Sequence, residues 1–436
     1  MKIAIAGYGV EGRENYAYWA KDSANTLTIV DERPAADVVY PEGAATLLGE
    51  DVFSRLDGFD LVIRTAGLAP RKIKTDGKVW SATNEFFAQC PAPIIGVTGS
   101  KGKGTTSSLI ASILEAAGKK VWLVGNIGLP ALSVLENIQP EDIVVYELSS
   151  FQLWDAVKSP HTAVVLFIEQ EHLDVHLDMA EYVEAKAQIT HWQTANDTLI
   201  YNAENQYATT IAENSPAQKV GYPSTDTAHI EAGYFYYGTQ RLCSVDTLAI
   251  KGAHNQTNAL AAIDAVWQCT QDPAAIEKGL AAFHGLPHRL AYVATVNEVE
   301  YYDDSIATTP ASAIAALRTF ADKPKVLILG GSSKGSDFSE LAQELTHHEV
   351  QVLLIGDEAA AIARACDDAG FARYEILPVP DEGVSVAEQV TWRAAALATP
   401  GGVVLLSPAA ASFGLFKNYV DRGEQFIAAV QQLSAK

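Results

Sequence analysis

Residues 94–106 read Ile94-Ile95-Gly96-Val97-Thr98-Gly99-Ser100-Lys101-Gly102-Lys103-Gly104-Thr105-Thr106, an apolar run followed by a glycine-rich loop. The glycines let backbone N–H groups converge on phosphate oxygens, and the helix expected to begin here adds partial positive charge. In loops of this kind the lysine, here Lys103, reaches the β- and γ-phosphates. The stretch predicts an ATP site with residues 99–106 as its contacts. The plainer alternative is a glycine-rich turn with exposed lysines.

The expected metal position of this loop departs from the common pattern. A Ser or Thr that binds Mg²⁺ usually follows the lysine, but Gly104 follows Lys103 here. Thr105, Thr106 or a water molecule is left to take that place. A carboxylate is also expected beside phosphate-bound Mg²⁺. Glu147 follows the apolar run at 143–146 and is the candidate, with a surface glutamate at a strand end as the alternative.

Apolar runs alternate with helical stretches along almost the whole chain, which is typical of α/β folds with parallel sheets. Helices are expected up to about residue 117 and from about 255 to 268, and strands at residues 3–6, 26–30, 61–64, 94–97, 121–124, 143–146, 163–167, 325–329, 350–355 and 402–406. Residues 201–250, rich in Tyr, Thr, Ser and Gly, predict a few antiparallel strands at the edge of a middle domain.

Two proline-containing stretches, Pro91-Ala92-Pro93 and Gly285-Leu286-Pro287-His288-Arg289, look like hinges between domains. The sequence therefore predicts three α/β domains. Residues 1–91 form a Rossmann-like domain, residues 92–288 form a P-loop ATPase domain, and residues 289–436 form a second Rossmann-like domain. Sites are expected at the carboxyl ends of the strands and between domains.

Composition excludes several classes of protein. The 436 residues carry a net charge of −22, which disfavours binding to nucleic acid. No run approaches the roughly 20 apolar residues of a membrane helix, and residues 1–7 read as a strand entering a turn rather than as a secretory leader. The cysteines are scattered without a CxxC pair, at Cys90, Cys243, Cys269 and Cys366. We expect a cytoplasmic protein that binds neither nucleic acid nor membranes.

Further motifs lie in order along the chain: Gly125-Asn126-Ile127-Gly128, Tyr146-Glu147-Leu148-Ser149-Ser150-Phe151-Gln152-Leu153, Glu171-His172-Leu173-Asp174, Ser407-Pro408-Ala409-Ala410-Ala411-Ser412 and Lys417-Asn418-Tyr419. With the phosphate loop and the second hinge, they resemble the Mur ligase family over nearly the whole chain. The run at 147–153 resembles its glutamate-adding members most closely. The resemblance implies a monomeric, ATP-dependent, amide-forming ligase of peptidoglycan precursor synthesis. Its expected substrates are UDP-N-acetylmuramoyl-L-alanine and glutamate, joined through an acyl-phosphate.

The resemblance also implies roles for four residues around the phosphates. Lys103 matches the phosphate-loop lysine, Glu147 matches a Mg²⁺ ligand, and His172 matches a histidine that helps to hold a second metal. Lys186 matches a lysine that is carbamylated in this family and helps to bind Mg²⁺; from the residues alone it reads as a solvated helix lysine. His172 and His176 are spaced as a helical zinc pair, but no third ligand is evident.

Nucleotide and substrate contacts follow in the same way. Asn255 and Asn258 match residues near the adenine, and Arg289 and Asp304 match ATP contacts from the hinge and the third domain. Asn126 matches a polar group on the substrate side, although a turn residue between glycines is an equal alternative.

The third domain is expected to bind the amino acid through Thr308, Lys334 and Ser412, which match hydroxyl and cation donors for its side-chain carboxylate. Ile306 departs from the pattern because the usual glutamate-adding enzyme has a lysine there. D-Glutamate is favoured, and L-glutamate remains open.

The first domain contains Gly7-Tyr8-Gly9-Val10-Glu11-Gly12 after a strand, and Asp31 ends the next strand. By itself this motif suggests dinucleotide binding. Under the resemblance, Asp31, Arg33 and Gly67 contact the UDP part of the substrate, and Glu11 departs from the small polar residue often found there. A folate-polyglutamate type of ligase, a nicotinamide-dependent oxidoreductase and a non-catalytic nucleotide-binding regulator are the alternatives.

Overall fold

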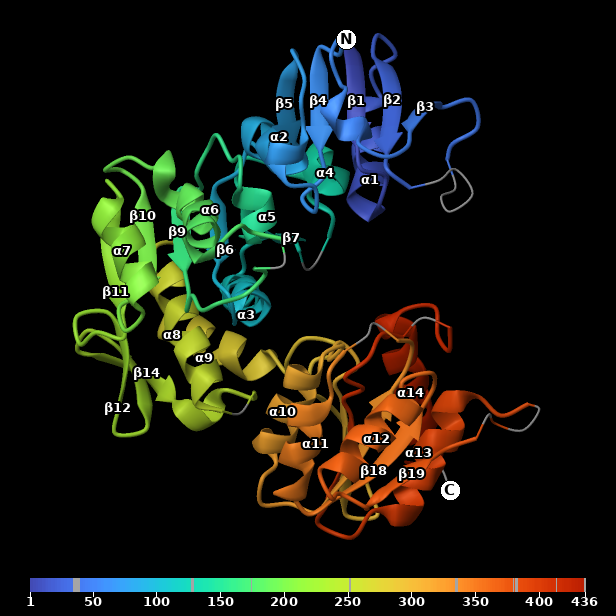
Figure 1. Cartoon of the computed structure of the whole chain (residues 1–436). Coiled ribbons are helices and arrows are strands. Elements are labelled where there is room, and N and C mark those ends of the chain that lie inside the picture. The colour runs from blue at the N-terminus through green and yellow to red at the C-terminus, as the bar shows by residue number, and fades with distance from the viewer. Residues whose placement is uncertain are drawn as a thin grey trace. The chain divides into compact units, whose positions relative to one another are not determined.

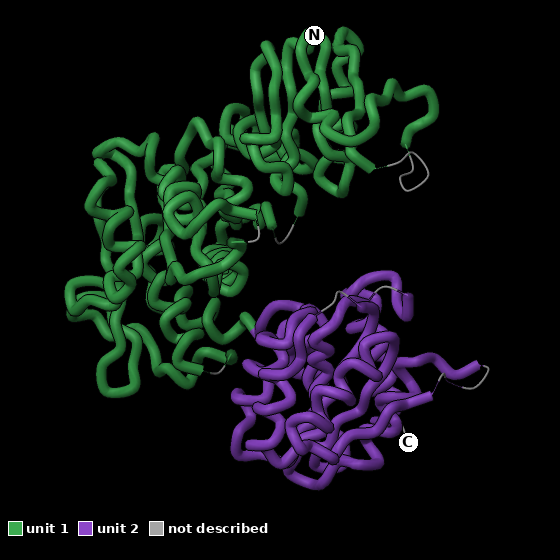
Figure 2. The backbone as a smooth tube through the Cα atoms, viewed as in Figure 1, with its two compact units in different colours: residues 1–283 green, residues 284–436 purple. Residues whose placement is uncertain are grey.

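The structure is a computed structural model that describes residues 1–33, 40–126, 129–173, 175–250, 252–333, 336–378, 380, 383–412 and 414–434. It divides into two compact units, residues 1–283 and 284–436 (Figure 2). The first unit contains two parallel sheets and a small antiparallel one, and the second contains one mixed sheet (Figure 1). None of the described helices is both long and apolar enough to cross a membrane.

The first sheet has the order β3-β2-β1-β4-β5, and all its strands are parallel. Its elements are β1 (Lys2–Ala6), α1 (Val10–Trp19), β2 (Thr26–Asp31), β3 (Ala45–Leu48), β4 (Leu61–Arg64), β5 (Lys78–Ser81) and α2 (Ala82–Gln89). The strands expected at 3–6, 26–30 and 61–64 are confirmed. The edge strands β3 and β5 were not predicted, because β3 is largely exposed and β5, which reads Lys78-Val79-Trp80-Ser81, has only two apolar residues in a row.

The second sheet is also parallel, in the order β11-β10-β9-β6-β8-β7. Its strands are β6 (Ile94–Thr98), β7 (Val121–Gly125), β8 (Ile143–Glu147), β9 (Thr162–Val165), β10 (Thr198–Asn202) and β11 (Gln218–Tyr222). The helices of this region are α3 (Lys103–Ala116), α4 (Ala131–Val134), α5 (Ser150–Leu153), α6 (Met179–His191), α7 (Gln206–Asn214), α8 (Ala253–Trp267) and α9 (Pro273–Ala282). The strand expected at 163–167 ends earlier, at Val165.

The stretch at 201–250 is partly as predicted. It contains the antiparallel strands β12 (Ala228–Glu231), β13 (Tyr234–Tyr237) and β14 (Gln240–Ser244), which form a separate three-stranded sheet. The prediction missed that β11 pairs in parallel with β10 and that α7 lies within this stretch.

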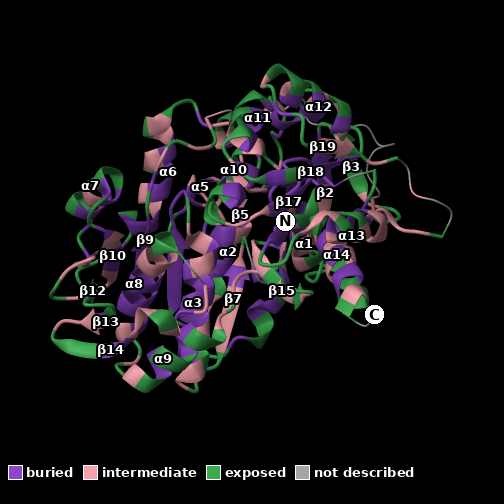
Figure 3. Cartoon of the chain, turned by 90° about the horizontal axis from the view of Figure 1, so that it is seen from below, coloured by how far each residue is buried: buried purple, intermediate pink, exposed green. Residues whose placement is uncertain are grey.

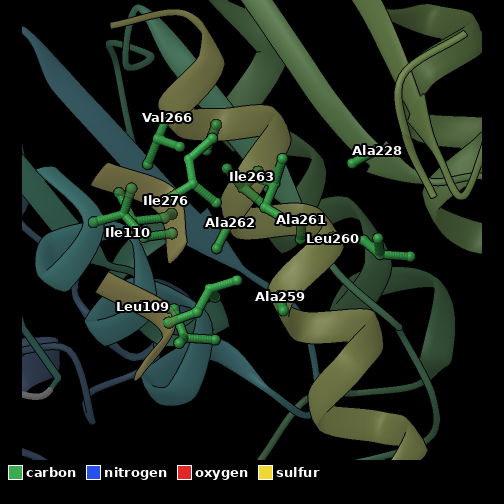
Figure 4. Close-up of a cluster of buried hydrophobic side chains, with 14 of the residues drawn as sticks. Leu109, Ile110, Ala228, Ala259, Leu260, Ala261, Ala262, Ile263, Val266 and Ile276 are labelled. Atoms are coloured by element: carbon green, nitrogen blue, oxygen red, sulfur yellow. The ribbon is translucent and has the colours of Figure 1, made fainter. Parts of the chain in front are cut away.

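The core of the central region fixes the helix that follows the phosphate loop. Leu109 and Ile110 of α3 pack with Val266 of α8 and Ile276 of α9 (Figure 4). Buried residues run along α3 and α8 (Figure 3), and the apolar area removed from water there stabilises both helices. Ser112 Oγ also donates a hydrogen bond of 2.8 Å to Gly279 O, which joins α3 to α9. The phosphate loop is thus held between a buried strand and a buried helix.

The second unit has the sheet order β15-β16-β20-β17-β18-β19, in which β15 and β16 are antiparallel and the other pairs parallel. Its strands are β15 (Ala291–Val296), β16 (Val299–Asp303), β17 (Lys325–Gly330), β18 (Val350–Ile355), β19 (Tyr374–Ile376) and β20 (Val403–Leu406). Its helices are α10 (Pro310–Thr319), α11 (Ser339–Thr346), α12 (Ala359–Asp368), α13 (Val386–Leu397) and α14 (Tyr419–Ser434). The three predicted strands are confirmed as β17, β18 and β20.

Candidate functional site

The glycine-rich loop joins β6 to the first turn of α3. Gly102 has φ +85° and caps the helix, and the first helical hydrogen bond runs from Thr106 N to Gly102 O. The N–H groups before Thr106 therefore precede the helical ladder, as at any helix N-terminus that binds an anion. Ser100 anchors the loop, because its N–H donates to Phe167 O at 2.8 Å and its Oγ donates to Glu169 O at 2.9 Å.

Two lysines meet at one carbonyl of this loop. Lys103 Nζ donates to Gly99 O at 2.9 Å and to Ser100 O at 2.8 Å, and Lys186 Nζ donates to Gly99 O at 2.8 Å. Lys186 is 1% exposed, so the reading as a solvated helix lysine is wrong. Burial, and then the charge of Lys103, hold the pKa of Lys186 well below its usual value.

Sequence reasoning gave no role to Tyr182, which connects several of these groups. Its hydroxyl lies 2.9 Å from Ser100 Oγ, its ring centroid lies 4.5 Å from Lys186 Nζ, and its ring lies edge-on to the ring of His172. The signal was present, because Tyr182 lies four residues before Lys186 and therefore on the same face of α6. Tyr182 thus links the loop to the histidine segment.

Asn258 brings α8 to the phosphate loop. A Cβ at Gly102 would overlap Asn258 Oδ1, so the side chain of Asn258 lies directly against the loop backbone. Asn258 Nδ2 in turn donates to Asn255 Oδ1 at 3.4 Å. The two asparagines expected near the adenine therefore lie together beside the loop, although they are about 150 residues away in sequence.

Glu147 ends β8 and is 3% exposed, so it is not a surface glutamate. Asn126 Nδ2 donates to Glu147 Oε1 at 3.2 Å, and Asn126 N donates to Glu147 O at 3.2 Å. Glu147, the carboxylate expected to hold Mg²⁺, is thus oriented by Asn126, whose side chain is expected to contact the substrate. Ile127 and Gly128 of the same motif lie outside the described residues.

The histidines do not form a zinc pair on a helix, since both precede α6 in a non-helical segment. His172 is partly exposed with φ +58°, whereas His176 is buried, stacks on Phe151 and lies 3.0 Å through Nε2 from Ser150 Oγ. Within the described part of the chain, no three His, Cys, Asp or Glu side chains are grouped as metal ligands. Asp174 is outside the described residues.

A cleft of about 360 Å³ lies between the first and second sheets of the first unit. Its lining includes Glu11 and Gly67 from the first sheet region and Asn126 from the second. Burial raises the pKa of Glu11, whose Oε2 accepts a hydrogen bond from Ala66 N at 2.8 Å. Glu11 therefore contributes a carboxyl group to the cleft where a small polar residue was expected.

Asp31 and Arg33 form a pair at the end of β2. Arg33 donates to both carboxylate oxygens, and Tyr8 N donates to Asp31 Oδ2 at 2.8 Å. Burial of Asp31 would raise its pKa, but the hydrogen bonds from Arg33 and Tyr8 outweigh burial and lower it. Asp31 is thus an anion held by Arg33, whose side chain is half exposed.

In the second unit, the loops after β16 and β20 lie side by side. Ser407 Oγ donates to Asp304 Oδ2 at 2.7 Å, and Ala409 N donates to Ala307 O at 2.9 Å, which places the segments leading to Thr308 and Ser412 together. Burial raises the pKa of Asp304 to about 7. Arg289 is exposed, Ser412 is buried, and Lys334 lies outside the described residues.

Comparison with protein families identifies two domains in this chain. The Mur ligase middle domain matches residues 97–266, and the Mur ligase glutamate ligase domain matches residues 288–410. A curated relative from Clostridium tetani, named UDP-N-acetylmuramoylalanine–D-glutamate ligase, is 33% identical over 99% of this chain and 97% of its own. One of the same name from Acetivibrio thermocellus is 36% identical over 100% of this chain and 97% of its own.

The chain belongs to the Mur ligase family. Solved structures agree in fold with this Mur ligase. MurF from Acinetobacter baumannii gives a TM-score of 0.61 at 18% identity and covers 100% of this chain and 90% of its own. MurC from Thermotoga maritima gives 0.59 at 18% identity over 99% of both chains. The family resemblance read from the motifs is confirmed.

Proposed function

We propose that this Mur ligase joins D-glutamate to UDP-N-acetylmuramoyl-L-alanine and consumes ATP. The observation that carries the proposal is the meeting of Lys103 and Lys186 at Gly99 O, in a loop built between a buried strand and a helix N-terminus. Relatives with this printed name match nearly the full chain at 33% and 36% identity, and MurF from Thermotoga maritima was solved with ADP.

In the proposed reaction the carboxylate of the UDP-linked substrate attacks the γ-phosphorus of ATP and gives an acyl-phosphate and ADP. The amine of glutamate then attacks the acyl carbon, phosphate leaves, and the amine loses a proton as the amide forms. A carboxylate is a poor electrophile, and phosphorylation supplies its leaving group. Because most of such catalysis is positioning and charge neutralisation, the donors of the loop at 99–106 suit it.

The residues around the loop fit a Mg²⁺ site. Glu147 offers a buried carboxylate, and Thr106 Oγ1 is buried without a hydrogen-bond partner among the described residues. Glu147, His172, carbamylated Lys186 and a threonine hydroxyl (Thr105 or Thr106) would hold Mg²⁺, which neutralises phosphate charge when bound. The lowered pKa of Lys186 increases its neutral fraction, and only a neutral amine adds to carbon dioxide, with loss of a proton, to give an anionic carbamate.

We assign the substrates to three parts of the chain. Residues 1–91 bind UDP through Asp31, Arg33 and Gly67, and the cleft with Asn126 receives the rest of this substrate. Residues 92–288 bind ATP, with Asn255 and Asn258 beside the adenine and Arg289 and Asp304 as further contacts. Residues 289–436 bind glutamate through Thr308, Lys334 and Ser412. The reaction is proposed for a monomer in the cytoplasm. The four cysteines are free, as is usual in a reducing compartment.

Release of ADP tests the function. The purified chain is incubated with ATP, Mg²⁺ and UDP-N-acetylmuramoyl-L-alanine, and then with D-glutamate, L-glutamate or no amino acid. We expect turnover with D-glutamate and little with its enantiomer. The partly exposed Ile306, at a position where a lysine is usual, makes L-glutamate the second candidate. Turnover with neither enantiomer would overturn the proposal.

A further inference from the structure

Arg64 ends β4 of the first sheet and is completely buried. Its Nη1 donates to the carbonyls of Thr65 at 3.2 Å, Ala66 at 3.1 Å and Leu68 at 2.9 Å. A guanidinium presents its N–H donors in one rigid plane, so three carbonyls around one nitrogen fix the path of the loop that carries them. Arg64 therefore shapes residues 65–68, which follow the strand.

The other edge of the same guanidinium faces the second sheet region. Arg64 Nε donates to Asp155 Oδ2 at 2.9 Å, Nη2 donates to Asp155 Oδ1, and Nη2 also donates to Phe151 O at 3.0 Å. Phe151 belongs to α5, and Asp155 follows it. One side chain thus holds two segments that are separated by about 90 residues in sequence.

Both segments are walls of the cleft described above. Ala66 and Gly67 line one side of it, and Ser149, Phe151 and Gln152 line the other. Ala66 and Phe151 are at once acceptors of Arg64 and lining residues, one in each wall. Because every acceptor is fixed to the same planar group, the distance between the two walls is set by the reach of the guanidinium.

We propose that Arg64 and Asp155 are a positioning pair that sets the width of the substrate cleft without touching substrate. The assignment of the cleft to the UDP-linked substrate rests on the proposed function. The connection that Arg64 makes between the two walls, called the clamp below, rests only on the contacts of Arg64. Loss of the pair lets the loop at 65–68 and α5 move independently, so the UDP-linked substrate binds less tightly, whereas the phosphate loop and ATP are not directly affected.

The kinetic test compares Arg64→Met, Arg64→Lys and Asp155→Asn with the unsubstituted chain. We expect the KM for the UDP-linked substrate to rise roughly tenfold or more in Arg64→Met and Asp155→Asn, and the KM for ATP to stay within about twofold. Arg64→Lys should be intermediate, because an ammonium group cannot make the paired contact with Asp155. An unchanged KM for the UDP-linked substrate, or an equal rise in both KM values, overturns the pair as a positioning device.

The chain offers a matched control. Lys21 Nζ and Glu136 Oε1 form an ion pair of 2.9 Å that also joins the first sheet region to the second, but both side chains are exposed and neither lines the cleft. Exposed pairs contribute little. Lys21→Met should therefore leave both KM values unchanged. This result would show that the effect of Arg64→Met depends on where Arg64 lies, and does not follow from removing any cation between the two sheet regions.

Hydrogen exchange tests the clamp without any turnover. In Arg64→Lys and Asp155→Asn, amides at 65–68 and at 150–155 should lose protection together, while amides of β1 and β6 keep theirs. Loss of protection on one side alone, or on neither side, overturns the clamp. If the unsubstituted chain shows no ADP release, the proposed function fails, and the exchange comparison still decides whether Arg64 joins the two walls.

Discussion

Lys103 and Lys186 share one acceptor, the carbonyl oxygen of Gly99, at 2.9 and 2.8 Å. Lys186 is buried, and its ammonium group is also repelled by that of Lys103, so burial first and then this repulsion hold the pKa of Lys186 well below its usual value. Lys103 lies in the first turn of α3 and lowers the pKa of Lys186. This asymmetry suggests different roles: Lys103 as the cation for phosphate and Lys186 as the amine to be modified.

The first prediction concerns Lys103. Lys103→Ala should lower kcat by about 10²-fold to 10³-fold or more, because it removes a charged donor from the reacting phosphate. ADP release measures the loss. Lys119→Ala is the control, since Lys119 is exposed beyond the end of α3 and should leave the rate unchanged. Near-normal activity of Lys103→Ala would contradict the assignment of residues 99–106 as the loop that binds the phosphates of ATP.

The second prediction concerns carbamylation of Lys186. Intact-protein mass spectra at alkaline pH should show the added mass of carbon dioxide, and the addition should disappear in Lys186→Ala. The sign of the pH effect follows from the neutral amine, whose fraction rises with pH until the lowered pKa is passed. Activity should fall when carbon dioxide and bicarbonate are removed and return when they are restored. Full activity without them, and no mass addition, would contradict the modification.

The phosphate loop and most strands were readable because their signals are local. The apolar run at β6 and the glycines after it can be recognised without information from any other part of the chain. By contrast, α7 was missed although Asn205 caps it and Ala208, Ile211 and Ala212 follow at helical spacing. The aromatic residues around α7 favoured strands, and this composition was given more weight than the short helical pattern of apolar residues.

The burial of Lys186 was also visible in principle. Tyr182, Ala185, Lys186 and Ile189 form the buried stripe of α6, so the lysine lies on the apolar face. A lysine is usually exposed to solvent, which favoured an exposed position for Lys186, whereas its place on the apolar face of α6 favoured burial. The contact of Gly102 with Asn258 was different, because no local pattern states which helix will lie against a loop 156 residues earlier.

The third prediction tests that contact. Gly102→Ala combines a left-handed φ of +85° with a Cβ that would overlap Asn258 Oδ1. The backbone strain alone costs roughly 1–2 kcal/mol, and the clash displaces the loop or α8. The KM for ATP should rise about tenfold or more, measured with the UDP-linked substrate saturating. Adding Asn258→Ala relieves the clash but not the strain, so we compare the double variant with Asn258→Ala alone. A penalty for Gly102→Ala that is equal in both backgrounds would show that the contact does not matter.

The last prediction concerns Asp264 of α8, which is completely buried. Its Oδ1 accepts a hydrogen bond of 2.9 Å from Ala228 N in β12, and its Oδ2 has no hydrogen-bond partner among the described residues. Burial raises its pKa to about 7 from 3.8, and the bond from Ala228 lowers it only in part. The folded chain therefore keeps a proton that the unfolded chain releases between about pH 4 and pH 7.

Stability from this group is thus complete below about pH 4 and is lost as the pH rises through about 7, a change of roughly 4 kcal/mol. Asp264→Asn keeps an acceptor for Ala228 and cannot ionise. Its melting temperature should exceed that of the unsubstituted chain at pH 8, and the difference should vanish near pH 4. Hydrogen exchange of β12 amides gives the same comparison locally.

Asp142 supplies a control of opposite sign. Hydrogen bonds from Gln139 N and from the indole of Trp122 lower its pKa, so its stabilisation is present above about pH 4 and is lost at lower pH. Asp142→Asn should therefore destabilise the chain most at neutral pH, where Asp264→Asn stabilises it. Parallel pH profiles for the two variants would rule out a buried neutral carboxyl at Asp264, because only a group that holds its proton to about pH 7 gives the inverted dependence.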